Sequence, residues 1–154
     1  MIKVLFVCHG NICRSPMAEF VLKDMVQKRG LADKFYIASA ATSTEEIGNP
    51  VHRGTREKLR EVGISTAGKT AIQMTHRDCA DYDYLIYMDS WNLRNIRRIG
   101  GAAAEDKSFP LLGFAGEDRD IADPWYTGNF EATYSDVIRG CTAFLEYLRR
   151  EGQL

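Results

Sequence analysis

The apolar run at the start of the chain sets the strongest limit on its fold. Residues Lys3 to Cys8 read KVLFVC, without the polar alternation of a half-exposed strand. Such a run is typical of a strand buried on both faces, as parallel strands are. After the turn at Gly10, Ser15-Pro16 supplies a capping hydroxyl and then a residue with preset φ, which together favour a helix start. The sequence therefore predicts a strand, a tight loop and a helix beginning at this serine.

The rest of the chain repeats the order of strand and helix. Further strands are predicted at residues 35–40, 84–88 and 107–112, and helical apolar spacing recurs in residues 17–26, 51–62, 92–99 and 130–148. This alternation favours right-handed crossovers and a parallel sheet. We therefore predict a single three-layer α/β domain over residues 1–154. Its four-stranded parallel sheet carries helices on both faces, with a phosphate-binding loop between the first strand and the first helix.

Net charge and hydrophobicity indicate which partners and which cellular compartment to expect. The 20 basic and 21 acidic residues give a net charge of −1, which predicts no nucleic-acid partner. The opening segment is too short for a signal peptide, and no stretch approaches the roughly 18 apolar residues of a membrane span. We expect a cytoplasmic monomer without membrane contact. In that compartment the four cysteines are expected to be thiols rather than disulfides; they are Cys8, Cys13, Cys79 and Cys141.

The loop after the first strand combines a nucleophile with groups that bind an oxyanion. Ligands of open α/β sheets gather at the carboxyl ends of strands, where loop N–H groups and a helix N-terminus suit a phosphate. Gly10 lets the backbone curl, Arg14 offers a planar fork for two oxygens, and Cys8 is expected to be a thiolate there. A buried, inert cysteine remains the alternative. Zinc binding is disfavoured because the cysteine and histidine spacings do not match a zinc site.

A candidate proton donor lies far down the chain in the sequence Asp123-Pro124-Trp125-Tyr126. Expulsion of a phenol from phosphate needs a proton, and a positioned carboxylic acid could provide it. Two aromatic residues follow that could flank a planar substrate ring. The spacing by itself leaves an ordinary Asp-Pro turn equally open.

Together, CHGNICRSP (residues 8–16) and DPWY (residues 123–126) resemble the low-molecular-weight protein tyrosine phosphatases. The likeness continues through SAATS, EIGNP and YDYLIYMDSWNLR and covers essentially the whole chain. It implies that Cys8 attacks phosphorus to form a phosphocysteine while Arg14 and the loop amides hold the oxygens. Asp123 would protonate the leaving phenol and then activate water. The implied substrates are phosphotyrosine proteins or small aryl phosphates, with phosphate and vanadate-type oxyanions as inhibitors and no metal or other cofactor.

The resemblance also implies roles for the loop's neighbours. Asn11 and Ser39 would brace the loop, the Ser15 hydroxyl would hydrogen-bond the thiolate, and Cys13 would trap oxidised Cys8 as a reversible disulfide. The residues implied in contact with substrate or phosphate, beyond the catalytic three, are His9, Gly10, Asn11, Ile12, Cys13, Ser15, Trp125 and Tyr126.

Four departures from the family pattern concern the rim of the site and its support. His9 replaces an aliphatic residue, and either tunes the pocket or is an exposed neighbour. Glu45 stands where many relatives have an aromatic wall, and Trp125 stands where tyrosine is frequent. A loop histidine found in some relatives is missing from Thr66–Thr70. The changes at Glu45 and Trp125 bear on peptide preference rather than on the chemistry. The missing histidine implies instead that part of the hydrogen-bond network behind the loop differs from that of those relatives.

Three other functions are compatible with a phosphate-binding loop of this kind, and the sequence disfavours each. An arsenate reductase needs two further cysteines on a mobile segment, and Cys79 has no partner before Cys141. A protein-arginine phosphatase typically has threonine where this chain has Ile12, a bulky residue that suits a flat phenyl ring. A non-catalytic phosphate-binding module would be expected to lack Cys8 or Asp123, and both are present.

Overall fold

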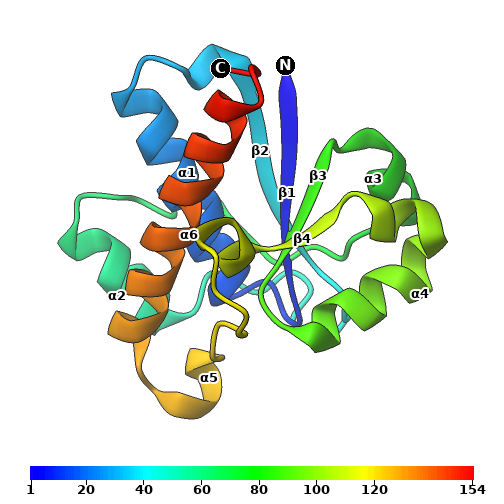
Figure 1. The fold of residues 1–154 in the computed structure, drawn as a ribbon. Coiled ribbons are helices and arrows are strands. Elements are labelled where there is room, and N and C mark those ends of the chain that lie inside the picture. Colours follow the sequence, from blue (N-terminus) through cyan, green and yellow to red (C-terminus); the bar gives the residue numbers. More distant parts are fainter.

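A computed structural model describes all residues, 1–154, and has a four-stranded parallel sheet at its centre (Figure 1). The strands are β1 (Ile2–Cys8), β2 (Phe35–Ala41), β3 (Tyr84–Tyr87) and β4 (Ser108–Pro110). Their order is β2-β1-β3-β4, and every neighbouring pair is parallel. The chain crosses over β1 to reach β3, so the order reverses beside β1, the topology at which open α/β sheets bind ligands.

Helices cover both faces of this sheet, which confirms the predicted three-layer α/β fold. They are α1 (Arg14–Lys28), α2 (Arg53–Glu61), α3 (His76–Asp81), α4 (Ser90–Asp106), α5 (Pro124–Thr127) and α6 (Phe130–Arg150), with short 3-10 helices η1 (Ala32–Lys34) and η2 (Leu111–Ala115). Figure 1 shows α1, α2 and α6 on one side of the sheet and α3 and α4 on the other. None of these helices combines the length and the apolar content needed to cross a membrane.

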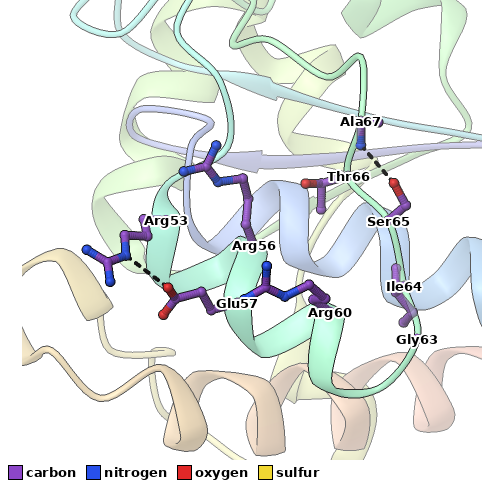
Figure 2. A pocket seen from close by; sticks show the side chains of 9 residues that line it. All are labelled: Arg53, Arg56, Glu57, Arg60, Gly63, Ile64, Ser65, Thr66 and Ala67. Carbon is purple, nitrogen blue, oxygen red and sulfur yellow. Dashed lines mark hydrogen bonds and ion pairs between the residues drawn. The ribbon is translucent and has the colours of Figure 1, made fainter.

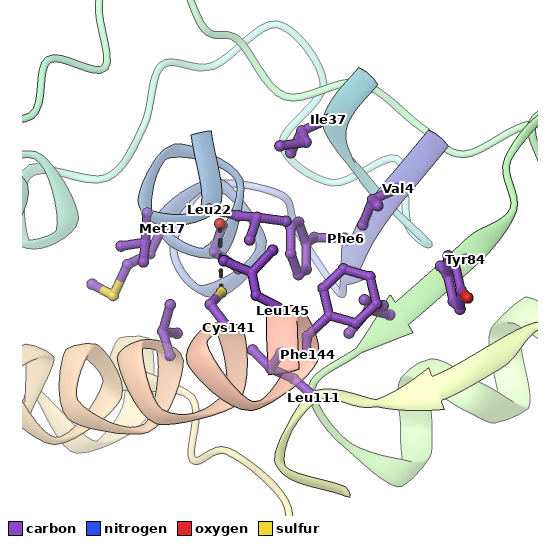
Figure 3. Close-up of a cluster of buried hydrophobic side chains, with 14 of the residues drawn as sticks. Val4, Phe6, Met17, Leu22, Ile37, Tyr84, Leu111, Cys141, Phe144 and Leu145 are labelled. Atoms are coloured by element: carbon purple, nitrogen blue, oxygen red, sulfur yellow. Dashed lines mark hydrogen bonds between the residues drawn. The ribbon is translucent and has the colours of Figure 1, made fainter. Parts of the chain in front are cut away.

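Strand β1 is buried on both faces because its successive side chains enter two different cores. Val4 and Phe6 point into the larger core with α1 and α6, whereas Leu5 and Val7 point into the smaller core with α3 and α4. This alternation is the period of two expected of a strand. Figure 3 shows the larger core, in which Phe6 packs beside side chains of α1 and α6. Burial on both sides holds the end of β1, and hence the following loop, in place.

The structure corrects several predicted boundaries. The first helix begins at Arg14 with Cys13 as its N-cap, so Ser15 lies inside the first turn and does not cap it. The helix predicted at 92–99 runs from Ser90 to Asp106, with a break at Gly101, whose φ is 72°. The segment 107–112 is a strand only over its middle residues and then becomes η2. Helix α3 was not predicted, because its six residues are too few for an apolar period.

Candidate active site

The loop between β1 and α1 lies at the carboxyl end of the sheet, where the topology predicts a site. It is pinned to the neighbouring strand by hydrogen bonds from Thr42 N–H to the Cys8 carbonyl and from Ser43 N–H to the His9 carbonyl. Asn11 has a φ of 59°, the only positive φ among the non-glycine residues. Asparagine tolerates this left-handed conformation better than most residues. The backbone of the loop therefore makes a tight turn between β1 and α1.

The Cys8 thiol lies at the base of this turn and is 3% exposed. Its Sγ is 2.9 Å from Ser15 Oγ and accepts a hydrogen bond of 3.3 Å from the Asn11 backbone N–H. The predicted contact between the Ser15 hydroxyl and this thiol is present.

A chain of buried hydrogen bonds supports the strained asparagine. The Asn11 side-chain amide donates to Ser15 Oγ at 2.8 Å and to Ser39 Oγ at 2.9 Å, so the predicted pair of Asn11 and Ser39 is in contact. The Ser39 hydroxyl donates in turn to Glu19 at 2.5 Å. The Ile72 backbone N–H donates to Asn11 Oδ1 at 3.2 Å. Every polar group of the Asn11 side chain therefore has a partner.

Lys69 lies beneath this chain of hydrogen bonds, in the segment Thr66–Thr70. Its Nζ donates to the Ser39 carbonyl at 2.9 Å and lies 3.8 Å from a carboxylate oxygen of Glu19. Burial lowers the pKa of this lysine below its ordinary value, against the opposing charge of Glu19. The second oxygen of Glu19 accepts from Lys23 at 2.6 Å. Two lysines thus neutralise the buried glutamate that holds Ser39.

The backbone amides of the loop form a set of unused donors. Only the Asn11 N–H has an acceptor, the Cys8 sulfur. The N–H groups with no acceptor in the protein are those of His9, Gly10, Ile12, Cys13, Arg14 and Ser15. The last of these lie in the first turn of α1, whose dipole is positive at this end. Converging free amides at a helix N-terminus are suited to a tetrahedral oxyanion.

The Arg14 guanidinium is almost fully buried and is oriented by three oxygens. Nη1 donates to Asp89 at 2.7 Å and to the Ile121 carbonyl at 2.9 Å, while Nη2 lies 3.5 Å from Asp123. The Nε–H and the second hydrogen of Nη2 have no protein acceptor, and they form one edge of the planar fork. Burial acts to lower the pKa of Arg14, but the charges of Cys8, Asp89 and Asp123 outweigh it and raise the pKa. The arginine is therefore a fixed cation with one free bidentate edge.

Cys13 differs from Cys8 although both are on the same loop. Burial, together with the negative charges of Cys8 and Asp123, raises the pKa of the Cys13 thiol to about 12. Thr55 donates to the Cys13 carbonyl at 3.3 Å. Cys13 is therefore a neutral thiol near pH 7. All four cysteines of the chain are free.

Asp123 comes to the same site from the other end of the chain. It is the N-cap of α5, where its Oδ1 accepts from the Trp125 N–H at 3.0 Å, and its Oδ2 faces Arg14. A cavity of about 130 Å³ lies between the loop and α5. It is lined by Cys8, His9, Gly10, Asn11, Ile12, Cys13, Arg14, Glu45, Glu46, Asp123, Trp125 and Tyr126. The two predicted motifs, more than a hundred residues apart in sequence, thus form one pocket.

The rim of this pocket is partly acidic. His9 Nε2 is 2.6 Å from Glu45, with the two side chains 50% and 67% exposed. His9 is therefore an exposed residue of the pocket mouth that is paired with a carboxylate. On the opposite side Trp125 and Tyr126 are 56% and 84% exposed, as expected for a wall open to solvent.

Sequence reasoning missed several residues of this site. Asp89, which orients Arg14, directly follows the Met88 that ends the predicted third strand, and its place at the carboxyl end of the sheet was a usable signal. Glu19 and Lys69 had no such signal, because their contacts join α1 to a distant loop. Nowhere do three His, Cys, Asp or Glu side chains come together as metal ligands would.

Comparisons with known proteins match this chain over nearly its whole length. Residues 3–154 match the model of the family described as low molecular weight phosphotyrosine protein phosphatase. The chain is 45% identical to the low molecular weight protein-tyrosine-phosphatase YfkJ of Bacillus subtilis over the full length of both. It superposes on the crystal structure of YfkJ with a TM-score of 0.93 at 43% identity, covering 98% and 96% of the two chains.

A second solved structure widens the range of substrates among the relatives. The crystal structure of the drosophila arginine phosphatase DARP matches with a TM-score of 0.87 at 32% identity, covering 95% of this chain and 97% of that one.

The family model spans all but two residues, and the similarity to YfkJ is spread over the whole length. This chain therefore belongs to the low molecular weight phosphotyrosine protein phosphatase family.

Proposed function

We propose that this phosphatase hydrolyses phosphotyrosine in proteins through a phosphocysteine intermediate formed on Cys8. Arg14 and the free amides of the loop would hold the three non-bridging phosphate oxygens, and Asp123 would act as acid and then as base. The observation that carries the proposal is the meeting of Cys8, Arg14 and Asp123 on one small pocket whose amides lack protein acceptors.

The first step transfers the phosphoryl group to sulfur. The Cys8 thiolate attacks phosphorus, the bond from phosphorus to the tyrosine oxygen breaks, and Asp123 gives its proton to the departing phenolate. In the transition state negative charge is spread over the equatorial oxygens, where the free edge of Arg14 and the amides can stabilise it. Asn11 and Ser15, which contact the sulfur, would stabilise it as the thiolate.

The second step hydrolyses the phosphocysteine and regenerates the free enzyme. Water attacks phosphorus, the Asp123 carboxylate takes a proton from that water, and the sulfur–phosphorus bond breaks to restore the thiolate and release phosphate. No electron transfer or cofactor is needed for either step. Vanadate, which resembles the trigonal transition state, is expected to compete for the same loop.

Substitution of the nucleophile Cys8 and detection of the phosphocysteine test the proposal. Cys8→Ser should reduce turnover of p-nitrophenyl phosphate by about 10⁴-fold or more, because a hydroxyl is a far weaker nucleophile than a thiolate at neutral pH. Cys79→Ser, a change at a buried cysteine outside the site, should keep the activity. Rapid acid quenching of the wild type followed by mass spectrometry should find phosphate on the peptide that contains Cys8. Full activity of Cys8→Ser, or phosphate found only on another residue, would refute the mechanism.

A protein-arginine phosphatase is the second candidate. Two observations favour it: the structural likeness to the drosophila arginine phosphatase, and the carboxylates Glu45 and Glu46 on the pocket rim, which suit a guanidinium. Against it stands Ile12 in the loop, whose bulk suits a phenyl ring. We therefore retain phosphotyrosine as the substrate class.

The two candidates are separated by paired substrates. The wild type should have a higher kcat/KM for a phosphotyrosine peptide than for the same peptide with phosphoarginine, and Ile12→Thr should shift the ratio towards phosphoarginine. A wild-type preference for phosphoarginine would reverse the assignment while leaving the chemistry of Cys8 intact.

A further inference from the structure

A second and larger hollow lies beside helix α2. It has a volume of about 710 Å³ and is bounded by α2 on one side and by residues 63–67 on the other (Figure 2). Three arginines of α2, Arg53, Arg56 and Arg60, line it together with a single acidic residue, Glu57. We call it the α2 groove.

Two of these arginines have no carboxylate partner. Glu57 is hydrogen-bonded to Arg53 at 2.9 Å, and Glu61, the other acid of α2, is paired with Lys58 at 3.2 Å. Neither Arg56 nor Arg60 forms an ion pair, and both are exposed. They are four residues apart and so lie on the same face of the helix. The groove therefore has a net positive charge on a chain whose total charge is −1.

The α2 groove begins next to the wall of the active-site pocket. His52, the N-cap of α2, donates its backbone N–H to the Ile12 carbonyl of the phosphate loop. Its ring also meets Trp125 edge to face, with 5.5 Å between the ring centres. Arg53 is the next residue. A substrate chain that leaves the pocket past Trp125 would therefore pass His52 and next meet Arg53, the first residue of the groove.

The other side of the pocket mouth has the opposite charge, because Glu45 and Glu46 line it. An acidic segment next to the phosphotyrosine would be repelled from that side and attracted towards Arg56 and Arg60. Arg53 and Arg60 are seven positions apart, which is about 10 Å along the helix axis. An extended peptide spans that distance with about three residues.

We propose that the α2 groove binds an acidic segment of the phosphoprotein substrate, close in sequence to its phosphotyrosine, and so selects among substrates; this rests on the proposed function. Peptide fits better than a polyanion such as nucleic acid. A continuous phosphate backbone would also meet the carboxylates of Glu57 and of the pocket rim, whereas two or three acidic side chains need not.

The test uses three matched phosphotyrosine peptides and one small substrate. One peptide has three acidic residues before the phosphotyrosine, one has them after it, and in the third they are replaced by asparagine and glutamine. Exposed ion pairs are individually weak. At low salt we expect kcat/KM for one of the two acidic peptides to be about three- to tenfold higher than for the neutral peptide. This ratio should fall as added salt screens the charges. The double variant Arg56→Gln with Arg60→Gln should remove this preference and leave p-nitrophenyl phosphate turnover unchanged.

The control variant is Arg149→Gln with Arg150→Gln, which makes the same change in charge at the distant end of α6. It should keep the preference. Absence of any preference in the wild type, or its equal loss in the control variant, would overturn the proposal. Duplex DNA and phosphatidylserine vesicles are tested as inhibitors of peptide hydrolysis. If either inhibits the wild type and the control variant but not the α2 double variant, the groove binds that ligand and the proposal is overturned. Failure of the wild type to hydrolyse p-nitrophenyl phosphate would instead refute the proposed function.

Discussion

Asp89 and the Ile121 carbonyl occupy one nitrogen of the Arg14 guanidinium and so determine which edge of it faces the pocket. An arginine can hold two phosphate oxygens at once only when that edge is free and its plane is fixed. Lysine would supply charge at this position but not the fork. The buried contacts of Arg14 therefore matter as much to the site as its charge.

Asp123→Ala should slow substrates according to their leaving group. A phenyl phosphate expels a basic phenolate and depends on the proton from Asp123, an effect of about 10²- to 10⁴-fold. p-Nitrophenolate is a much weaker base and leaves with less help, so the loss should be smaller. The measurement is kcat for the two substrates in the variant and in the wild type.

Asp118→Ala is the control, because Asp118 is an exposed aspartate of the same segment that forms no ion pair or hydrogen bond. It should slow neither substrate. Equal slowing of both substrates in Asp123→Ala would mean that this residue is not the proton donor.

At the scale of elements, the contact between α2 and the start of α6 positions one wall of the site. His52 stacks on Phe130 with 5.2 Å between ring centres and also touches Trp125. Phe130 in turn packs so closely on the first turn of α2 that a Cβ on Gly54 would lie 2.4 Å from its ring. The glycine is required there by close approach of two helices.

Gly54→Ala should therefore destabilise the protein by about 1–3 kcal/mol, the usual cost of overpacking. The direction is informative, since alanine normally stabilises an exposed helix position relative to glycine by up to about 1 kcal/mol. Urea unfolding measures the change in the free energy of unfolding. Arg60→Ala, on the exposed face of the same helix, should change it by less than about 0.5 kcal/mol. An increase in stability for Gly54→Ala would show that the helices can separate without cost.

At the scale of the whole molecule, the two cores contain thiols that resist ionisation. Burial raises the pKa of Cys141, in the larger core, well above its ordinary value of 9.0, and raises that of Cys79, in the smaller core, in the same direction. In the unfolded chain these thiols lose their protons above about pH 9, whereas the folded chain keeps them. The unfolded state then binds fewer protons, so the free energy of unfolding falls as the pH rises.

Cys141→Ala should make this alkaline loss of stability shallower. One such thiol contributes up to about 1.4 kcal/mol per pH unit above its unfolded value. The free energy of unfolding, measured in urea between pH 8 and pH 10.5, should therefore fall more steeply for the wild type than for the variant. The slopes are compared, because the lost side chain lowers the stability at every pH. Identical slopes would mean that Cys141 ionises in the folded protein as readily as in the unfolded chain.

Much of the fold follows from local pattern. The run from Lys3 to Cys8 predicted a strand buried on both faces, and the alternation of strands and helices predicted the parallel sheet, because side-chain periodicity reports burial directly. Local chemistry was less reliable at boundaries. Ser15 looked like a helix cap, but its hydroxyl is turned to Cys8 and Asn11 instead.

The sequence alone therefore determined the family, the type of sheet and the pattern of cysteine, arginine and aspartate, since each is written in short contiguous stretches of residues. Only the folded chain brought Asp123 to Arg14, set Lys69 beneath Ser39 and aligned Arg56 and Arg60 along a groove that begins at the pocket. The physical reason is that these arrangements depend on how α1, α2 and α5 pack at one end of the sheet, and such contacts between distant segments leave no periodic trace in a single sequence.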